Sequence, residues 1–379
     1  MSVVVREVNA VKDFTRFIDV PHLVYRGDPD WVPPLRDEAR KMFDRAKNPF
    51  FKHAEGAFWI AERDGRPVGR ICASVNRLHL DLHKDGQGNF GALEAIDDPD
   101  VFASLLKTAE DWLRARGLAK AVGPYTVSVN DEIGVLIEGF GAKPSLMMAH
   151  SPRHYAPRLE AAGYGKAMDL LAFRCPIGPR TDAFAERIGK VRARMRGGER
   201  LTVRTLDRKR FAQEIRLALD IYNDAWRGNW GFVPVTAEEA VALTHALKPI
   251  LDPRGVVFGL VDGVERGVLI GVPNLNELIA DLDGRLFPTG LVKLLWRLWR
   301  RPPKTARVML AGVREEWRGT ALGSALPPMM VSKVLERGKE LGIREVELSW
   351  VLEDNAPSIA ICSAVGDVAK RYRIYEKAL

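Results

Sequence analysis

The sequence contains few cysteines and lacks the long apolar runs of membrane-spanning proteins. Its three cysteines, Cys72, Cys175 and Cys362, lie far apart and form no C-x-x-C pair. This usage argues against a disulfide framework and a zinc site, and it predicts a reducing, cytoplasmic location. No stretch of about 18 consecutive apolar residues occurs, and the first residues lack the apolar core of a signal peptide. We therefore predict a globular protein without a membrane-spanning helix.

Histidine is equally sparse and offers no evident metal site. The seven histidines are scattered, and His79 and His83 stand in H-L-D-L-H without the glutamate of a metalloprotease motif. We expect no bound metal. No Ser-His-Asp or Cys-His arrangement appears in the context of a known motif, so a covalent enzyme intermediate is not predicted.

Basic residues outnumber acidic ones. The chain has 57 lysines and arginines against 49 aspartates and glutamates, which gives a formal net charge of +8. Such a surplus favours anionic partners: nucleic acid, an anionic membrane surface or a phosphate-rich cofactor. The basic residues do not form one run, which argues against nucleic acid. A chain of 379 residues is long enough for two domains with cores of their own.

One α/β pattern occurs twice along the chain. Both halves are predicted to run strand, helix, hairpin, strand, helix, strand, helix, strand. The fold class is therefore α/β, with two tandem units that each have a mixed central β-sheet flanked by helices. Four residues of the first half recur in the second half at a constant offset of 198 positions: Asp64, Gly65, Gly69 and Asn76 as Asp262, Gly263, Gly267 and Asn274.

The repeat predicts three parts. Residues 1–175 form a first domain, which binds substrate or is structural, and 176–200 form a helical connector. Residues 201–379 form a second domain with an insertion at 274–305, which is far longer than a normal connection.

The stretch 308–326 of the second half, V-M-L-A-G-V-R-E-E-W-R-G-T-A-L-G-S-A-L, joins a predicted strand to a long helix. Small residues at such a turn let the backbone approach a ligand closely. The first N–H groups of the helix have no internal partner and lie at the positive end of its dipole. The alternative is an ordinary helix start with small residues for packing. The predicted diphosphate cradle consists of Arg318, Gly319, Thr320, Ala321, Leu322 and Gly323.

The spacing Arg318-x-x-Ala321-x-Gly323 resembles the coenzyme A signature of the GNAT superfamily of N-acetyltransferases. The resemblance implies that 201–379 has the GNAT fold and uses acyl-CoA as co-substrate, and that 1–175 is a diverged copy. Ala321 stands where the superfamily usually has its first glycine. If this position needs a positive φ, alanine costs about 1 kcal/mol, whereas a helical φ costs nothing.

The same resemblance implies one coenzyme site, in the second half. In the first half the corresponding stretch 97–100 reads D-D-P-D, and its carboxylates would repel a diphosphate. The polar stretch S-V-N-D-E at 128–132 either binds an amine substrate or forms a capped turn. The backbone groups expected to receive the pantetheine arm are those of Ala311, Gly312 and Val313.

The general acid of the superfamily is missing from its usual position. The helix after the fifth GNAT strand often reads N-x-x-A-x-x-x-Y-x-x-x-G-F, with the tyrosine as acid. Asn355 keeps this frame and is counted with the coenzyme-binding residues, but Cys362 replaces the tyrosine and Asp367 the final aromatic residue. Tyr372 and Tyr375 are the predicted substitutes. Alternatively, both pack on a half-buried strand, where aromatic residues are favoured.

Acyl transfer to an amine also needs a base that removes a proton. Glu347 and Ser349 share one face of a predicted strand with the sequence E-V-E-L-S-W. A carboxylate in such a strand either faces a cleft or pairs with an arginine, and we predict Glu347 as the base. The alternatives are Asp354, Glu353 and Glu316.

The insertion contains a basic, aromatic-rich segment at 286–301, L-F-P-T-G-L-V-K-L-L-W-R-L-W-R-R. Apolar and aromatic residues with basic flanks are typical of a helix that lies on an anionic bilayer. The alternative is a lid helix that packs on the core and keeps its arginines in water.

The chain as a whole resembles the bacterial ceramide synthase-like acyltransferases. The resemblance rests on D-P-D-W-V-P-P-L at 28–35, S-V-N-D-E-I-G at 128–134, K-R-Y-R-I-Y-E-K at 370–377 and the tandem halves. It implies N-acylation of a sphingoid base, such as 3-oxosphinganine or sphinganine, by a long-chain acyl-CoA, in the cytoplasm or peripherally on the inner membrane. Two alternatives stay open: N-acylation of an amino acid or polypeptide amine, and a non-catalytic module for membrane or nucleic acid.

Overall fold

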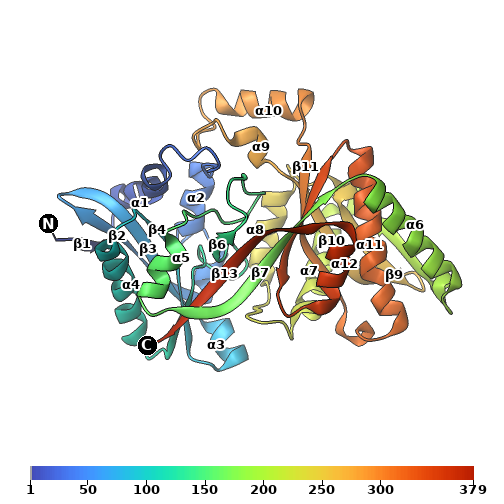
Figure 1. Cartoon of the computed structure of the whole chain (residues 1–379), viewed down its shortest axis with the longest axis horizontal. Coiled ribbons are helices and arrows are strands. Elements are labelled where there is room, and N and C mark those ends of the chain that lie inside the picture. The colour runs from blue at the N-terminus through green and yellow to red at the C-terminus, as the bar shows by residue number, and fades with distance from the viewer. Residues whose placement is uncertain (1) are drawn as a thin grey trace. The chain divides into compact units, whose positions relative to one another are not determined.

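The computed structural model describes residues 2–379, which form two compact units (Figure 1). Unit 1 comprises Met1–Leu170, Asn276–Arg301 and Lys370–Leu379, and unit 2 comprises Leu171–Leu275 and Pro302–Ala369. Each unit contains a β-sheet with helices packed on it, which confirms the predicted α/β class.

The compact units differ in composition from the repeated halves of the sequence. Contacts group 276–301 and 370–379 with the first part of the chain, and residues from 171 onward with the second. The division into 1–175, 176–200 and 201–379 concerns the repeat and stays a prediction. Among residues 2–379, no helix combines the length and the apolar content that crossing a membrane requires.

The sheet of unit 1 uses strands from both ends of the chain. Strands β4 and β5 are parallel, whereas the neighbours before them and the pair β5–β13 are antiparallel, so the sheet is mixed. The last strand of the chain, red in Figure 1, thus completes this sheet. Across the sheet the order is β1 (Val4–Glu7), β2 (Ala54–Arg63), β3 (Arg66–Asn76), β4 (Gln87–Ala95), β5 (Lys120–Gly123), β13 (Asp367–Ala378) and the first part of β7 (Gly165–Pro176), with β6 (Val135–Glu138) also on β13.

The helices of unit 1 cover this sheet with apolar faces. Helix α4 places Phe102, Leu105 and Leu113 at helical spacing against Ile71 and Phe90 of the sheet. The helices are α1 (Val11–Val24), α2 (Arg36–Phe43), α3 (Arg77–His83), α4 (Pro99–Arg114), α5 (Tyr155–Ala161), α9 (Asn276–Ile279) and α10 (Gly290–Arg300).

Unit 2 repeats the arrangement. Helix α11 places Leu326, Met330 and Val334 on the sheet, against Val257 and Leu269 among others. The strand order is β8 (Leu201–Thr205), β9 (Val256–Val261), β10 (Val264–Pro273), β11 (Thr305–Val313), β12 (Glu345–Leu352) and the end of β7. The helices are α6 (Pro179–Arg194), α7 (Phe211–Trp226), α8 (Ala237–Leu247), α11 (Ala321–Glu340) and α12 (Ala356–Val365).

The two hairpins predicted from Asp-Gly pairs have the same turn. Asp64 and Gly65 have φ values of 53° and 74°, and Asp262 and Gly263 have 51° and 76°. Two consecutive positive φ values are those of a type I′ turn, which matches the twist of the flanking strands. Identical turns at equivalent places support the repeat that the constant offset predicts.

Candidate functional site

The candidate site of unit 2 begins where β11 and β12 separate. Their parallel pairing ends at Val308 and Leu348, although both strands continue for several residues. On the other side of β11, the register with β10 skips Met309, so a bulge bends β11 at the point where it leaves β12. The result is a wedge whose one edge is the backbone of Ala311, Gly312 and Val313.

Helix α7 closes on this edge. The indole N–H of Trp226 donates to the carbonyl of Ala311 over 2.9 Å. A Cβ atom on Gly312 would lie 2.7 Å from the Cβ of Ala225, so only glycine allows the helix to come so near. Part of the predicted pantetheine edge is therefore already bonded to α7. Trp226 was not predicted from the sequence, because no residue near it in the chain indicates that it bonds to Ala311.

The turn after β11 is tied to α7 by carboxylates. A carboxylate oxygen of Asp224 accepts from the backbone N–H of Glu315 over 2.8 Å, and Asp220 pairs with Arg314 at 2.6 Å. Glu316 pairs with Arg266 at 2.7 Å. The turn that carries the cradle is thus fixed before any ligand binds.

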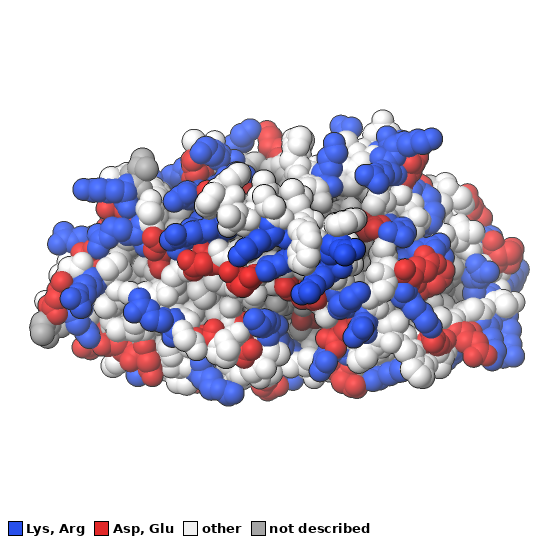
Figure 2. All heavy atoms as spheres, turned by 90° about the horizontal axis from the view of Figure 1, so that it is seen from above, with Lys and Arg blue, Asp and Glu red and all other residues white. Residues whose placement is uncertain are grey.

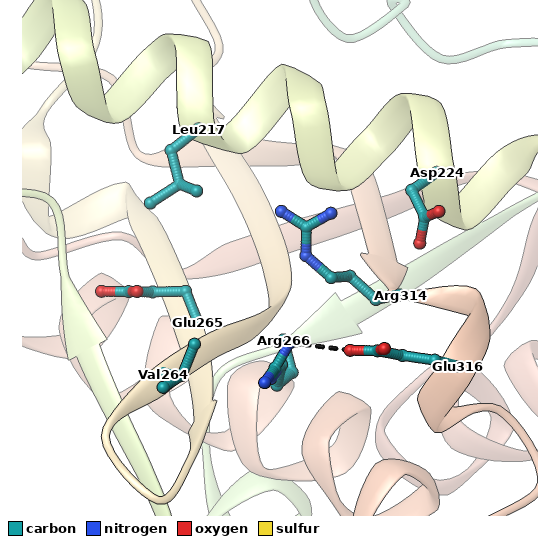
Figure 3. Close-up of a pocket in the computed structure, with 7 residues that line it drawn as sticks. All are labelled: Leu217, Asp224, Val264, Glu265, Arg266, Arg314 and Glu316. Carbon is teal, nitrogen blue, oxygen red and sulfur yellow. Dashed lines mark hydrogen bonds and ion pairs between the residues drawn. The ribbon is translucent and has the colours of Figure 1, made fainter.

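An open pocket of about 380 Å³ lies between α7, the start of β10 and this turn (Figure 3). Figure 3 shows Arg314 reaching toward α7 and Arg266 joined to Glu316. Burial alone would raise the pKa of Glu265, but hydrogen bonds from Arg204 lower it below its usual range. Three carboxylates balance the two arginines of this pocket. Its lining residues are Leu217, Asp224, Val264, Glu265, Arg266, Arg314 and Glu316.

The cradle itself opens helix α11. Thr320 is the N-cap residue: its hydroxyl accepts from the N–H of Gly323 at 3.0 Å and donates to the carbonyl of Trp317 at 2.8 Å. Ala321 and Leu322 begin the helix, so their N–H groups belong to the first turn, which has no acceptors within the helix. Arg318 is exposed beside them. These groups can hold an anion.

Two cradle positions answer the question raised by Ala321. Ala321 is the first residue of α11 and is not among the residues with positive φ, so alanine carries no backbone cost there. The residue that needs the left-handed region is Gly319, with φ of 70°. A Cβ atom on Gly323 would lie 1.9 Å from the carbonyl oxygen of Trp317, so this glycine lets the turn fold onto its own helix.

Glu347 lies in a hydrogen-bonded cluster on β11 and β12. The guanidinium Nε of Arg307 donates to the hydroxyl of Ser349 over 2.9 Å, and that hydroxyl donates to a carboxylate oxygen of Glu347 over 2.8 Å. Arg307 also faces Glu347 across the two strands and lies 4.9 Å from the ring centre of Trp350. An arginine partner was one of the two alternatives for Glu347, and the buried Arg307 is linked to its carboxylate through Ser349. A charged residue inside T-A-R-V-M-L was the signal for it.

The end of β12 carries the remaining candidates of unit 2. Asp354 is exposed in the turn, and Asn355 caps α12 by accepting from the N–H of Ser358 over 3.2 Å. Burial raises the pKa of the Cys362 thiol to about 12. This cysteine is therefore a buried neutral thiol rather than a nucleophile.

Both tyrosine candidates belong to unit 1. Tyr375 pairs with Gly123 of β5, and its buried hydroxyl donates to Glu160 over 2.9 Å. Burial raises the pKa of this phenol above its usual value. Tyr372 is also fully buried and pairs with Leu136 of β6. The environment of Tyr375 is that of a packed core.

In unit 1 the equivalent wedge is filled. The backbone N–H of Tyr125 donates to Phe90, and the N–H of Ala92 donates to Tyr125, at 2.9 and 3.1 Å. A Cβ atom on Gly91 would lie 1.3 Å from the carbonyl oxygen of Tyr125, so the chain itself occupies the slot between β4 and β5.

The N-terminus of α4 is occupied as well. Asp98 accepts from the N–H groups of Asp100 and Val101 at 2.9 and 3.3 Å and pairs with Arg63 at 2.6 Å. The polar stretch 128–132 is a turn in which Asp131 accepts from the N–H of Ser128 over 2.9 Å. The anion position of unit 1 is taken by a carboxylate of the chain. Within residues 2–379, no group of three His, Cys, Asp or Glu side chains is placed to hold a metal ion.

Comparison with known proteins gives relatives along the full chain, although no protein-family model matches it. The chain is 41% identical to a bacterial ceramide synthase of Caulobacter vibrioides over 98% of this chain and 96% of that protein. It is 38% identical to protein YghO of Escherichia coli K12 over 97% of this chain and 93% of that protein.

Solved structures resemble the fold at much lower identity. A tandem GNAT protein from the clavulanic acid biosynthesis pathway has a TM-score of 0.54 and 15% identity, and covers 100% of this chain and 98% of its own. A GCN5-related N-acetyltransferase from Sphaerobacter thermophilus has a TM-score of 0.51 and 16% identity over 99% and 95%. At these identities the likeness concerns the fold alone, and it confirms the predicted tandem GNAT architecture.

Proposed function

Because the chain belongs to the family of bacterial ceramide synthases, we propose that it transfers a long-chain fatty acyl group from acyl-CoA to the amine of a sphingoid base such as 3-oxosphinganine or sphinganine. The chain is an N-acyltransferase. The observation that carries the proposed substrate is identity of 41% to a ceramide synthase along 98% of the chain. The cradle at the start of α11 and the wedge between β11 and β12 support acyl-CoA as the donor.

The coenzyme would be held by unit 2 alone. Arg318 and the first N–H groups of α11 would hold its diphosphate, with Gly319, Thr320 and Gly323 shaping the turn around them. The backbone from Ala311 to Val313 would face the pantetheine arm, with Asn355 near the end of the opposite strand. The filled wedge of unit 1 supports a single coenzyme site per chain.

The chemistry needs one proton acceptor before attack and one proton donor after it. We assign the acceptor role to Glu347, which would take the proton of the substrate ammonium. The amine nitrogen then attacks the thioester carbon and the C–N bond forms. As the C–S bond breaks, the nitrogen gives up its second proton and the departing thiolate takes one up from the acid, which is reprotonated in turn, so the products are the amide and the free thiol. Ser349 and Arg307 hold the Glu347 carboxylate in place. Asp354 is the alternative base. Tyr372 stays proposed as the acid, whereas Tyr375, the other candidate from the sequence, fits this role less well because its buried hydroxyl already donates to Glu160.

A second candidate function keeps the same site but changes the acceptor to an amino acid or polypeptide amine. Full-length identity to a ceramide synthase favours the lipid amine. We also propose that the protein is cytoplasmic and associates peripherally with an anionic inner membrane through 286–301.

The decisive experiment follows release of free thiol from acyl-CoAs of graded chain length, with and without sphinganine. We expect palmitoyl-CoA to be cleaved only when sphinganine is present, and mass spectrometry to detect the N-acyl product. Release only from acetyl-CoA with a peptide amine would replace the lipid function by the second candidate. No change in melting temperature with any acyl-CoA would contradict both.

A further inference from the structure

Helix α10 presents an apolar stripe to solvent. Val292, Leu295, Trp296 and Trp299 follow the spacing i, i+3, i+4, i+7, so they lie on one face. Their exposed fractions are 68%, 57%, 49% and 76%, and Phe287 just before the helix is 68% exposed. A folded protein in water rarely leaves a stripe of this kind uncovered.

The opposite face of α10 is anchored within unit 1. Leu294 packs with Leu286 on a cluster formed by Val32, Ile279 and Leu282. This packing gives the helix a defined orientation. The face that packs on unit 1 is already buried, so the exposed stripe is a second apolar face of the same helix.

One arginine fastens the helix in that orientation. Arg297 donates to the carbonyl of Leu278 over 2.6 Å and to a carboxylate oxygen of Asp281 over 2.7 Å. The same two side chains form an ion pair, with Arg297 Nη1 2.5 Å from Asp281 Oδ1.

The charge of the segment that carries the stripe is entirely positive. The segment 286–301 contains four basic residues and no acidic one, and Lys293, Arg300 and Arg301 are exposed. Arg300 lies 5.0 Å from the ring centre of Trp299, and Arg301 lies 5.6 Å from that of Trp296. Figure 2, which views the molecule from above, shows uncharged atoms on this face with basic side chains, and some acidic ones, around them.

Apolar exposure is concentrated here rather than spread over the surface. Of the twelve large hydrophobic side chains that are exposed in the described residues, six lie between Phe287 and Trp299. Scattered exposed hydrophobic residues need no explanation, but a cluster marks an interaction surface.

We propose that this stripe, consisting of Phe287, Val292, Leu295, Trp296 and Trp299, docks onto an anionic lipid bilayer with α10 parallel to its surface. Tryptophan suits the boundary between headgroups and acyl chains, and the flanking cations suit anionic headgroups. A second copy fits less well, because a two-fold contact would place the same cations of both copies near one another. The choice of a membrane rests on the proposed function, since both proposed substrates carry long chains that partition into bilayers.

The test measures partition of the full-length protein onto vesicles by co-sedimentation, without substrates. We expect binding to phosphatidylcholine vesicles that contain phosphatidylglycerol and much weaker binding to phosphatidylcholine alone. The double variant W296E/W299E should lose roughly tenfold or more in partition. Replacing Lys293, Arg300 and Arg301 by glutamine should each cost roughly fivefold, and only on the anionic vesicles.

The control is Leu82→Glu, which adds one negative charge, against two in W296E/W299E, at a side chain that is 45% exposed on α3. It should bind vesicles as the wild type does, and all variants should keep the wild-type melting temperature. Equal binding by W296E/W299E and wild type, or no binding by the wild type, would overturn the proposal. A concentration-dependent dimer that W296E/W299E abolishes, without vesicle binding, would assign the stripe to a second copy instead.

The outcome is independent of the proposed reaction. Transfer from palmitoyl-CoA to a water-soluble, short-chain analogue of sphinganine, in the absence of membranes, should be the same for W296E/W299E and wild type. Vesicle binding without any transfer would support the docking surface and refute the proposed reaction. Transfer without vesicle binding would support the reaction and refute the docking surface.

Discussion

At the scale of single residues, substitutions of Glu347 and Ser349 test the proposed catalytic base. Glu347→Gln keeps the shape of the side chain but removes the proton acceptor, so kcat should fall about 10²–10⁴-fold. Ser349→Ala removes the hydrogen bond that holds the carboxylate, and a bond to a charged group contributes about 1.5–3 kcal/mol, so kcat should fall roughly tenfold or more. Steady-state kinetics with palmitoyl-CoA and sphinganine measure both effects.

A conservative exchange supplies the control. Ser349→Thr keeps the hydroxyl and suits a strand, so it should recover much of the activity that Ser349→Ala loses. A loss confined to Asp354→Asn, with Glu347→Gln fully active, would transfer the role of base to Asp354.

Gly319 allows a second test at the same scale. Gly319 and Gly65 have φ values of 70° and 74°, and a Cβ atom at either position would meet nothing within 4 Å. Alanine should therefore destabilise the fold by about 1 kcal/mol in both cases. Only Gly319→Ala should also weaken acyl-CoA binding, because Gly65 lies in a hairpin of unit 1. The measurement is the melting temperature with and without palmitoyl-CoA. Equal ligand-induced shifts in the two variants would mean that Gly319 is not part of the coenzyme site.

Which residues could be predicted follows from the range of the interactions they make. Thr320 as a cap and Asp-Gly as a turn are local features, since their partners lie within a few residues. The cluster of Arg307 with Ser349 joins two strands that are far apart in the sequence. Trp226 and Ala311 are more distant still, so neither pair leaves a local pattern. Gly323 was predicted for ligand approach, whereas its nearest constraint is the carbonyl of Trp317.

At the scale of elements, helices α11 and α4 begin at equivalent places in the two halves, but only the N-terminus of α11 is open to an anion. Thr320 caps α11 with a neutral hydroxyl and leaves the dipole open to an anion, whereas Asp98 caps α4 with a carboxylate. Thr320→Ala and Asp98→Ala should each cost about 1 kcal/mol of stability. Only Thr320→Ala should weaken acyl-CoA binding, as isothermal titration can measure. Weaker binding in Asp98→Ala would place a coenzyme in unit 1 and contradict a single site.

Asp98 also gives a pH dependence with a definite sign. The hydrogen bond from Arg63, followed by backbone N–H groups, lowers the pKa of Asp98 from its ordinary 3.8. Its contribution to stability is therefore present above pH 3.8 and is lost as the pH falls from there through the folded-state pKa. Wild type should lose more stability than Asp98→Ala over this range in denaturant titrations. Parallel curves would mean that the ion pair does not form in solution.

At the scale of the whole molecule, the repeat and the compact units are different divisions of one chain. Two halves could be predicted because turns and glycines recur at a fixed offset. It could not be predicted that the last strand of the second half joins the sheet of unit 1. Nothing in K-R-Y-R-I-Y-E-K indicates that this strand pairs with β5. Strand partners far along the chain are fixed by the packing of whole sheets, which a local pattern does not encode.

The pairing of β13 with β5 predicts how fragments of the chain behave. A fragment of residues 1–200 retains β1 to β7 but lacks β13, so β5 loses the partner that pairs with Gly123 and Val122. Glu110 loses its ion pair with Lys377 at 2.9 Å, and Glu160 loses the hydroxyl of Tyr375. An exposed strand edge and the loss of an ion pair at the buried Glu110 destabilise a fold and favour aggregation. We expect 1–200 alone to be insoluble or unfolded, and co-expression with 201–379 to restore a soluble complex. Circular dichroism and gel filtration report both results, and a fragment 1–200 that unfolds cooperatively by itself would mean that β13 is dispensable to unit 1.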